Sequence, residues 1–224
     1  LVTPLVTIFA GVGLSMLIAA PIGAAASQVG TLIMWATEQA PLVMGILVSV
    51  IVGVALTLPI SSAAICAALG LTGLAGGAAV AGCCAQMVGF AVMSYKENGV
   101  GGLVSQGLGT SMLQMGNIIK NPRIWIAPTL ASAITGPLAT CVFHFEMNGA
   151  AVSSGMGTCG LVGQIGVYTG WVSDIAAGTK AAITPMDWAA MVLLCFVLPA
   201  VLSVIFCEIE RKLGWIKDGD LKLN

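Results

Sequence analysis

The sequence predicts an all-α fold: a polytopic integral membrane helical bundle with broken or re-entrant helices and an interfacial amphipathic helix. The composition is 58% hydrophobic and only 8% charged, whereas a typical soluble domain is about 25% charged. Residues 208–224 hold eight of the 17 charges, which leaves nine for residues 1–207. So few charges cannot cover a water-exposed surface. Long uncharged segments in a bilayer must be helical, because a helix satisfies its own backbone hydrogen bonds.

The same composition excludes several classes of protein. A soluble enzyme and a disordered tail are incompatible with it, and a net charge of −1 provides no field for nucleic acid. The lone His144 cannot build a metal site without partners. The seven cysteines have no CxxC spacing and lie mostly in apolar runs, as small buried hydrophobic residues do. We therefore expect no metal, no cofactor and no catalytic nucleophile–base pair.

Uncharged runs locate the membrane-spanning segments, since a span needs about 20 apolar residues. Run 1–37 fits one span and an interfacial segment. Run 39–95 is best divided into a span over 42–57, a shorter broken helix over 60–73 and a span over 77–95. Tryptophans beside charges support these borders, because amphipathic rings concentrate where an apolar span meets the headgroups.

Two later segments are also informative. Residues 188–207 form the cleanest single span, and Pro199 is expected to kink it. In residues 109–121, methionine, leucine and isoleucine recur at a spacing of three to four, with polar residues between them, until Pro122. This pattern predicts an amphipathic helix that lies along the interface or lines a cavity.

The charge distribution suggests a division into a membrane permease domain, residues 1–207, and a short charged tail, residues 208–224. Four lysines and arginines follow the last span closely, so we expect the C-terminus to be cytoplasmic. The chain begins Leu1-Val2-Thr3-Pro4, without a methionine or a basic region. We therefore expect that this start is not a signal peptide and that an N-terminal part is missing.

Glu146 is the strongest candidate for a binding residue, because a charge inside or beside an apolar span is costly and is usually retained for a function. It lies with His144 and Asn148 between an apolar run and a Gly/Ser-rich stretch. A carboxylate accepts hydrogen bonds from sugar hydroxyls, and histidine can donate or accept. Phe143 and Phe145 could form apolar floors for a ring. The alternative is an ordinary loop with a solvated glutamate and histidine.

A second candidate constellation lies at the end of the amphipathic segment. Asn117 and Arg123, with Lys120 and Asn121 between them, combine amides and cations that can bind a polyhydroxylated or anionic ligand. The alternative is that the cations anchor the helix at the lipid headgroups.

Two uncharged polar residues are further candidates. Pro59 breaks a helix and frees carbonyl groups, and Ser61 either satisfies them or contacts substrate. Gln164 lies inside another apolar run. The stretch Gly155–Gly160 matches GxGxxG, but no strand precedes it, so a nucleotide-binding fold is not expected. The glycines instead suit close backbone packing or a re-entrant loop that turns at membrane depth.

As a set, five stretches of the chain resemble one membrane family, the enzyme IIC-like family of the bacterial phosphoenolpyruvate:sugar phosphotransferase system, in the branch that includes toxin-regulator-like proteins. The resemblance covers most of residues 30–175, and family members are usually longer at the N-terminus. The stretches are Thr57-Leu-Pro-Ile-Ser-Ser-Ala-Ala-Ile65, Leu69-Gly-Leu-Thr-Gly-Leu-Ala-Gly76, Ser94-Tyr-Lys-Glu-Asn98, Asn117-Ile-Ile-Lys-Asn-Pro122 and Gly155-Met-Gly-Thr-Cys-Gly-Leu-Val-Gly-Gln164.

The resemblance implies a multi-pass permease of the bacterial inner membrane, commonly a homodimer embedded in lipid, that binds a sugar-like solute near the midplane. A glutamate and a histidine help to bind the sugar in better-known branches, and Glu146 and His144 are the candidates here. Separate IIA and IIB proteins relay phosphate from phosphohistidine. This chain has no IIB-type cysteine loop and no IIA-type histidine site, so it would be the membrane component of a phosphohistidine–sugar phosphotransferase and not a phosphoryl carrier.

The sequence is compatible with three functions. The first is a solute permease of the phosphotransferase type. The second is a regulatory or sensory membrane protein on the same scaffold, which binds a ligand and signals without transport. The third is a phosphate-independent secondary transporter or channel, for which Glu146 is the clear intramembrane carboxylate that could couple to protons.

Overall fold

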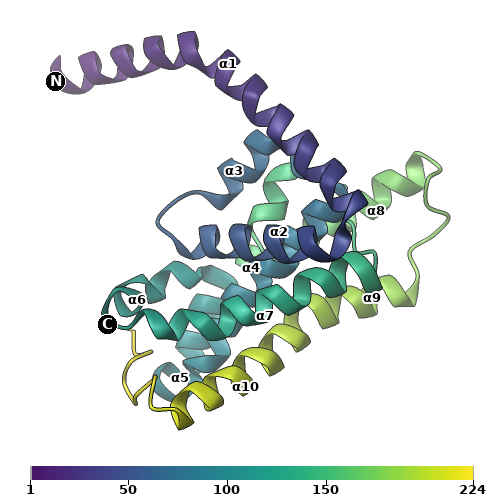
Figure 1. The fold of residues 1–224 in the computed structure, drawn as a ribbon. Helices are drawn as coiled ribbons and strands as arrows, with labels where there is room; N and C mark the ends of the chain where they lie inside the picture. The colour runs from purple at the N-terminus through teal and green to yellow at the C-terminus, as the bar shows by residue number, and fades with distance from the viewer. Residues whose placement is uncertain (1, 224) are drawn as a thin grey trace.

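The computed structural model describes the backbone of residues 2–223, with the side chains of residues 8, 11–13 and 21–223. Helices connected by short segments make up this range, and no β-strand occurs in it, so the all-α prediction is confirmed (Figure 1). The α-helices are α1 (Val2–Gln39), α2 (Pro41–Thr57), α3 (Ser62–Leu69), α4 (Gly73–Met93), α5 (Tyr95–Val104), α6 (Met115–Lys120), α7 (Ile126–Pro137), α8 (Val162–Ala176), α9 (Pro185–Val192) and α10 (Leu198–Lys212). Short 3-10 and π-helical turns are η1 (Ser105–Gly109), η2 (Ser111–Gln114), η3 (Pro122–Trp125), η4 (Leu138–Val142), η5 (Ala151–Gly155), η6 (Cys159–Leu161) and η7 (Leu193–Val197).

The core of the bundle consists of α2, α4, α7 with η4, and the continuous helix α9–η7–α10 (Figure 1). Helix α4 lies at its centre, and every residue from 75 to 87 is buried. Nearly all of these residues are glycine, alanine or cysteine, and small residues allow neighbouring backbones to approach closely. A methyl group on Gly82, for example, would overlap the backbone of Ser49 in α2.

Among the described residues, three helical segments are long and apolar enough to cross a bilayer: 73–93, 122–142 and 185–212. Helix α2 is a shorter apolar helix of 17 residues. The spans expected over 42–57, 77–95 and 188–207 therefore correspond to α2, α4 and α9–η7–α10, and the broken helix expected over 60–73 corresponds to α3. The first run is one continuous helix, α1, that includes Pro21.

The last long helix contains the expected proline, Pro199, in its second half. The π-helical turn η7 directly precedes it. Proline cannot donate a backbone hydrogen bond and collides with the preceding turn, so a local change of helical pitch before it relieves both problems.

The core helices have two common ends. At the loop end, Gly73 at the start of α4 pairs with Met147, with each backbone N–H donating to the other's carbonyl at 3.0 Å. At the tail end, Lys96 beyond the end of α4 forms an ion pair of 2.8 Å with Glu208 in α10. The 21 residues of α4 connect the two ends over about 30 Å, at 1.5 Å per residue. That length matches the hydrocarbon thickness of a bilayer.

A re-entrant segment, hairpin one (residues 143–176), enters the bundle from the loop end. Its turn reaches the middle of α4, where Gly157 packs against the backbone of Cys83 and Cys84. Gly157 and Gly160 have positive φ values of 53° and 52°, a conformation that glycine adopts without strain. Helix α8 then returns the chain to the loop end. The irregular backbone is tolerated at this depth because it is buried in protein, as the glycine-rich stretch predicted.

A second segment, hairpin two (residues 94–121), enters from the tail end and turns at the π-helical η1. Its returning arm, η2 and α6, covers most of the predicted amphipathic segment 109–121. Gln114 and Asn117 are buried, whereas Ile119 is 72% exposed. The amides Gln114 and Asn117 therefore point into the protein with Ile118, whereas Met112, Leu113 and Ile119 are exposed, and buried amides beside exposed apolar side chains are expected when the surroundings are lipid.

The C-terminal residues 213–223, which we call the tail strap, fold back across hairpin two. Ile216 and Leu221 are buried in a cluster with residues of α4, α6 and α10. Helix α10 continues to Lys212 and so crosses residue 207, where the sequence suggested that a membrane domain ends and a charged tail begins. That division of the chain stays a prediction. The side chains that bind the backbone of the strap come from hairpin two: Glu97, Asn98, Gln114, Asn117 and Asn121.

A fully buried amide, Gln86, joins the core helices at the centre of the bundle. Its Oε1 accepts a hydrogen bond from the indole Nε1 of Trp125 at 2.9 Å and from the hydroxyl of Thr57 at 3.3 Å. Its Nε2 donates to the hydroxyl of Thr129 at 3.2 Å. One side chain thus connects α4 with α2 and α7.

We expect Gln86→Leu to lower the free energy of unfolding by about 2–4 kcal/mol, because Trp125 and Thr57 would lose a buried partner with no water to replace it. Unfolding of the protein in detergent, followed by circular dichroism, measures the change. Leu130→Ala, at an exposed position of α7, is the control and should change stability by about 0.5 kcal/mol or less. Equal stability of Gln86→Leu and the wild type would contradict this role.

Candidate functional site

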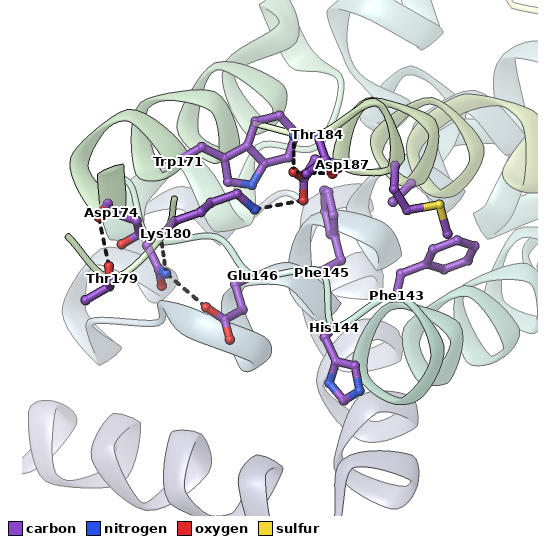
Figure 2. A pocket seen from close by; sticks show the side chains of 13 residues that line it. Phe143, His144, Phe145, Glu146, Trp171, Asp174, Thr179, Lys180, Thr184 and Asp187 are labelled. Carbon is purple, nitrogen blue, oxygen red and sulfur yellow. Dashed lines mark hydrogen bonds and ion pairs between the residues drawn. The ribbon is translucent and has the colours of Figure 1, made fainter. Parts of the chain in front are cut away.

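A polar cavity of about 540 Å³ lies at the loop end of the bundle (Figure 2). Its walls come from Phe143–Asn148 of hairpin one, the end of α8, the loop after it and the first turns of α9. The volume falls in the range of pockets that bind small molecules, roughly 300–1,000 Å³.

Glycines hold the segment 143–149 in the position that forms one wall. A methyl group on Gly77 of α4 would overlap the carbonyl of Phe145, and one on Gly170 of α8 would lie 2.8 Å from the backbone nitrogen of Asn148. Both helices therefore contact the segment through bare backbone. Such contacts fix the depth at which the following polar side chains emerge.

Asn148 links two carboxylates from different elements. Its Nδ2 donates to Oε2 of Glu146 at 3.0 Å and to Oδ2 of Asp174 in α8 at 2.9 Å. Glu146 is exposed and Asp174 is half-buried, so each carboxylate keeps acceptor capacity for a ligand in the cavity.

An ion pair forms the opposite wall. Lys180 Nζ lies 2.8 Å from Oδ1 of Asp187 and 5.6 Å from the ring centroid of Trp171. Figure 2 shows the Lys180 side chain between these two residues. Asp187 also completes a capping box with Thr184 at the start of α9. The pair is fixed at both ends, since the indole supports the ammonium and the helix N-terminus supports the carboxylate.

The chemistry of the cavity suits binding of a polar solute. Three carboxylates and one ammonium surround it, so hydrogen-bond acceptors outnumber donors. Ionised carboxylates accept hydrogen bonds from hydroxyl and amino groups. The aromatic rings of Phe143, Phe145 and Trp171 supply apolar surface beside these acceptors.

Three of the predicted site residues come together here: His144, Glu146 and Asn148 all line the cavity. His144 has a positive φ of 44° and is exposed. Its imidazole points away from the polar cluster around Glu146 in Figure 2. Their role in binding stays a prediction.

The other four predicted residues lie elsewhere. Ser61 accepts a hydrogen bond from the backbone N–H of Ala64 and caps α3. Gln164 in α8 is buried against the middle of α4, with its Nε2 3.2 Å from the Cys84 sulfur. The remaining two are at the tail end, where Asn117 donates to the tail strap and Arg123 lies over the ring of Trp215 at 5.7 Å.

Sequence reasoning missed Asp174, Lys180 and Asp187. All three lie in the segment 174–187, and charges of mixed sign are ordinary at a membrane border. The signal that could have identified them is their position between Trp171 and Trp188, whose rings lie 5.6 Å apart across the loop. That pair of tryptophans indicates that the two ends of the charged loop meet.

A helical membrane bundle with re-entrant hairpins from both ends and a polar cavity at one end defines a membrane transport protein, because broken helices at depth are typical of solute pathways. The model of one family, described as "Phosphotransferase system, EIIC", matches residues 1–223. The chain belongs to this family, and it is a membrane permease component of a phosphotransferase system. No curated protein and no solved structure matches the chain.

We expect Asn148→Asp to make the stability of the protein depend on pH. The new carboxylate would stand within about 3 Å of two others, and ionised like charges repel, so the variant should be most stable near pH 5 and lose stability as the pH rises to 8. Thermal unfolding in detergent at both pH values measures this. Asn148→Ala, which removes the amide without adding charge, should show the pH dependence of the wild type; the same profile in both variants would contradict the arrangement.

Proposed function

We propose that the chain binds a sugar-like solute in the cavity at the loop end and translocates it across the membrane. The observation that carries this proposal is the position of Glu146. Its carboxylate lies where hairpin one enters the bundle, and it shares the amide of Asn148 with Asp174. The rings of Phe143, Phe145 and Trp171 line the same cavity. A solute bound there by its hydroxyl groups would face the segment that reaches the centre of the bundle.

The proposal includes an orientation in which the tail end is cytoplasmic and the cavity faces outward. Of the chain's eight basic residues, all but Lys180 lie at the tail end, whereas four of its nine acidic residues lie at the loop end. Cytoplasmic segments of membrane proteins carry the excess of lysine and arginine. The seven basic residues at the tail end are Lys96, Lys120, Arg123, Arg211, Lys212, Lys217 and Lys222.

Family membership supports the choice of partners. The phosphotransferase type requires IIA and IIB proteins that carry the phosphoryl group, and these would act on the cytoplasmic, tail end. We further propose that the permease works as a homodimer in lipid, with its exposed apolar helix faces against bilayer or partner.

Uptake into proteoliposomes tests the binding residue. The wild type, supplied with phosphorylated donor proteins, should accumulate at least one of a panel of radiolabelled hexoses, hexosamines and pentoses. Glu146→Gln should reduce its uptake at least tenfold, because the neutral amide loses charge-assisted hydrogen bonds to the solute.

The matched control is Glu38→Gln, which removes an exposed glutamate at the end of α1 and should transport at the wild-type rate. Equal transport by Glu146→Gln and Glu38→Gln would contradict the assignment of Glu146. Accumulation driven by a pH gradient alone, without the donor proteins, would favour a secondary transporter.

Protease protection tests the orientation. Lys212 and Lys217 are exposed, so trypsin added to inside-out vesicles should cleave the tail strap, and trypsin added to right-side-out vesicles should leave it intact. Mass spectrometry of the C-terminal fragment distinguishes the two. Cleavage only in right-side-out vesicles would reverse the proposed orientation.

A further inference from the structure

The turns of the two hairpins meet at mid-depth of the bundle. The hydroxyl of Thr158 in hairpin one donates a hydrogen bond to the backbone carbonyl of Gly107 in hairpin two. The same hydroxyl lies 3.6 Å from the sulfur of Met87 in α4. Thr158 is fully buried, whereas Leu108 and Leu161 beside it in the two turns are exposed.

Helix α4 shows how deep this contact is. Met87 follows Gly73 by 14 residues, which places it about 21 Å from the loop end at 1.5 Å per residue. Hairpin one thus lines about two-thirds of α4 and hairpin two the remaining third. A solute in the cavity faces hairpin one, and the tail end lies beyond the contact.

The backbone of both turns departs from regular α-helix. On the side of hairpin one, the turn includes Leu161 with a φ of 59°, a strained conformation for a residue with a side chain. On the side of hairpin two, the turn is the π-helical η1, and π-helical turns are often found where a helix changes shape.

The arms, in contrast, are fixed to the rest of the molecule. Hairpin two is bound by the tail strap, with Glu97 accepting hydrogen bonds from the backbone N–H groups of Gly219 and Leu221. Hairpin one is fixed at the loop end by the backbone contacts of Gly77 and Gly170. A movement that leaves the arms in place can separate only the turns.

We propose that the contact between Thr158 and Gly107 is a gate that separates the cavity from the tail end, and that it must open for a solute to pass. The proposal rests on the proposed function, because a gate has meaning only in a protein that translocates a solute. The contact between Thr158 and Gly107 is separate from the binding residues around Glu146.

A short, reversible thiol cross-linker across the two turns tests the gate. A methyl group on Gly107 would lie 3.4 Å from the Cβ of Ala91, a tolerable contact, and more than 4 Å from every atom of Thr158, so a bifunctional methanethiosulfonate is used in place of a direct disulfide. The Gly107→Cys and Thr158→Cys double variant, treated with this reagent, should take up the transported radiolabelled sugar at least tenfold more slowly. Dithiothreitol, which releases the reagent, should restore the uptake.

The single variants Gly107→Cys and Thr158→Cys, treated with the same reagent, are the matched controls and should transport alike before and after treatment. Full transport by the cross-linked protein would overturn the gate. Failure of the reagent to link the two cysteines would overturn the contact on which the gate depends.

A second readout does not need a sugar. Glu146→Cys, in a background with the exposed Cys141 replaced by serine, reports access to the cavity by a membrane-impermeant thiol reagent. Modification from the loop side should be at least tenfold faster than modification from the tail side. Adding Thr158→Val should raise the rate from the tail side about fivefold, the effect of losing one hydrogen bond.

The two readouts separate the possible failures. A wild type that takes up no sugar of the panel would contradict the proposed function, while the reagent still tests the barrier. Equal modification from both sides, or no effect of Thr158→Val, would overturn the gate even in a protein that transports.

Discussion

Backbone that leaves a helix inside a bilayer must find its hydrogen-bond partners within the protein, and the structure of this molecule depends on that requirement. Both hairpins meet it by packing irregular backbone against other backbone. Helix α4 can receive hairpin one because most of its buried residues up to Ala85 are glycine, alanine or cysteine, so that Gly157 comes within contact of Cys83 and Cys84. Larger side chains on α4 would expel the hairpin, and with it the segment that carries Glu146.

Uncharged amides supply the hydrogen-bond partners of other side chains and of the backbone of the tail strap. Gln86 joins three core helices, Gln114 and Asn117 satisfy carbonyls of the tail strap, and Asn148 satisfies two carboxylates at once. An amide both donates and accepts without carrying charge, so it costs less to bury than a lysine or a glutamate. Charges are consequently confined almost entirely to the two ends, which gives the ends opposite character and supports a direction of transport.

Much of the helical plan could be predicted from the sequence. The uncharged runs locate α2, α4 and α9–η7–α10, and the glycine-rich stretch around Gly157 indicates a turn at depth, because apolar length and glycine content act locally along the chain. The amphipathic segment was also recognised, but spacing alone could not decide which face points inward. In the structure Gln114, Asn117 and Ile118 are buried, while Ile119 is exposed, because lipid outside the protein accepts an apolar side chain but not an amide.

The sequence by itself therefore determined that this is a helical membrane protein of the phosphotransferase EIIC type, with Glu146 as the charge that fits no membrane border. Only the tertiary structure decided what surrounds Glu146. Asp174 and the pair of Lys180 and Asp187 are 28 to 41 residues further along the chain, and no local pattern relates them to it. The return of α8 along α4 brings them together, because hairpin one must be buried against α4 to satisfy its own backbone.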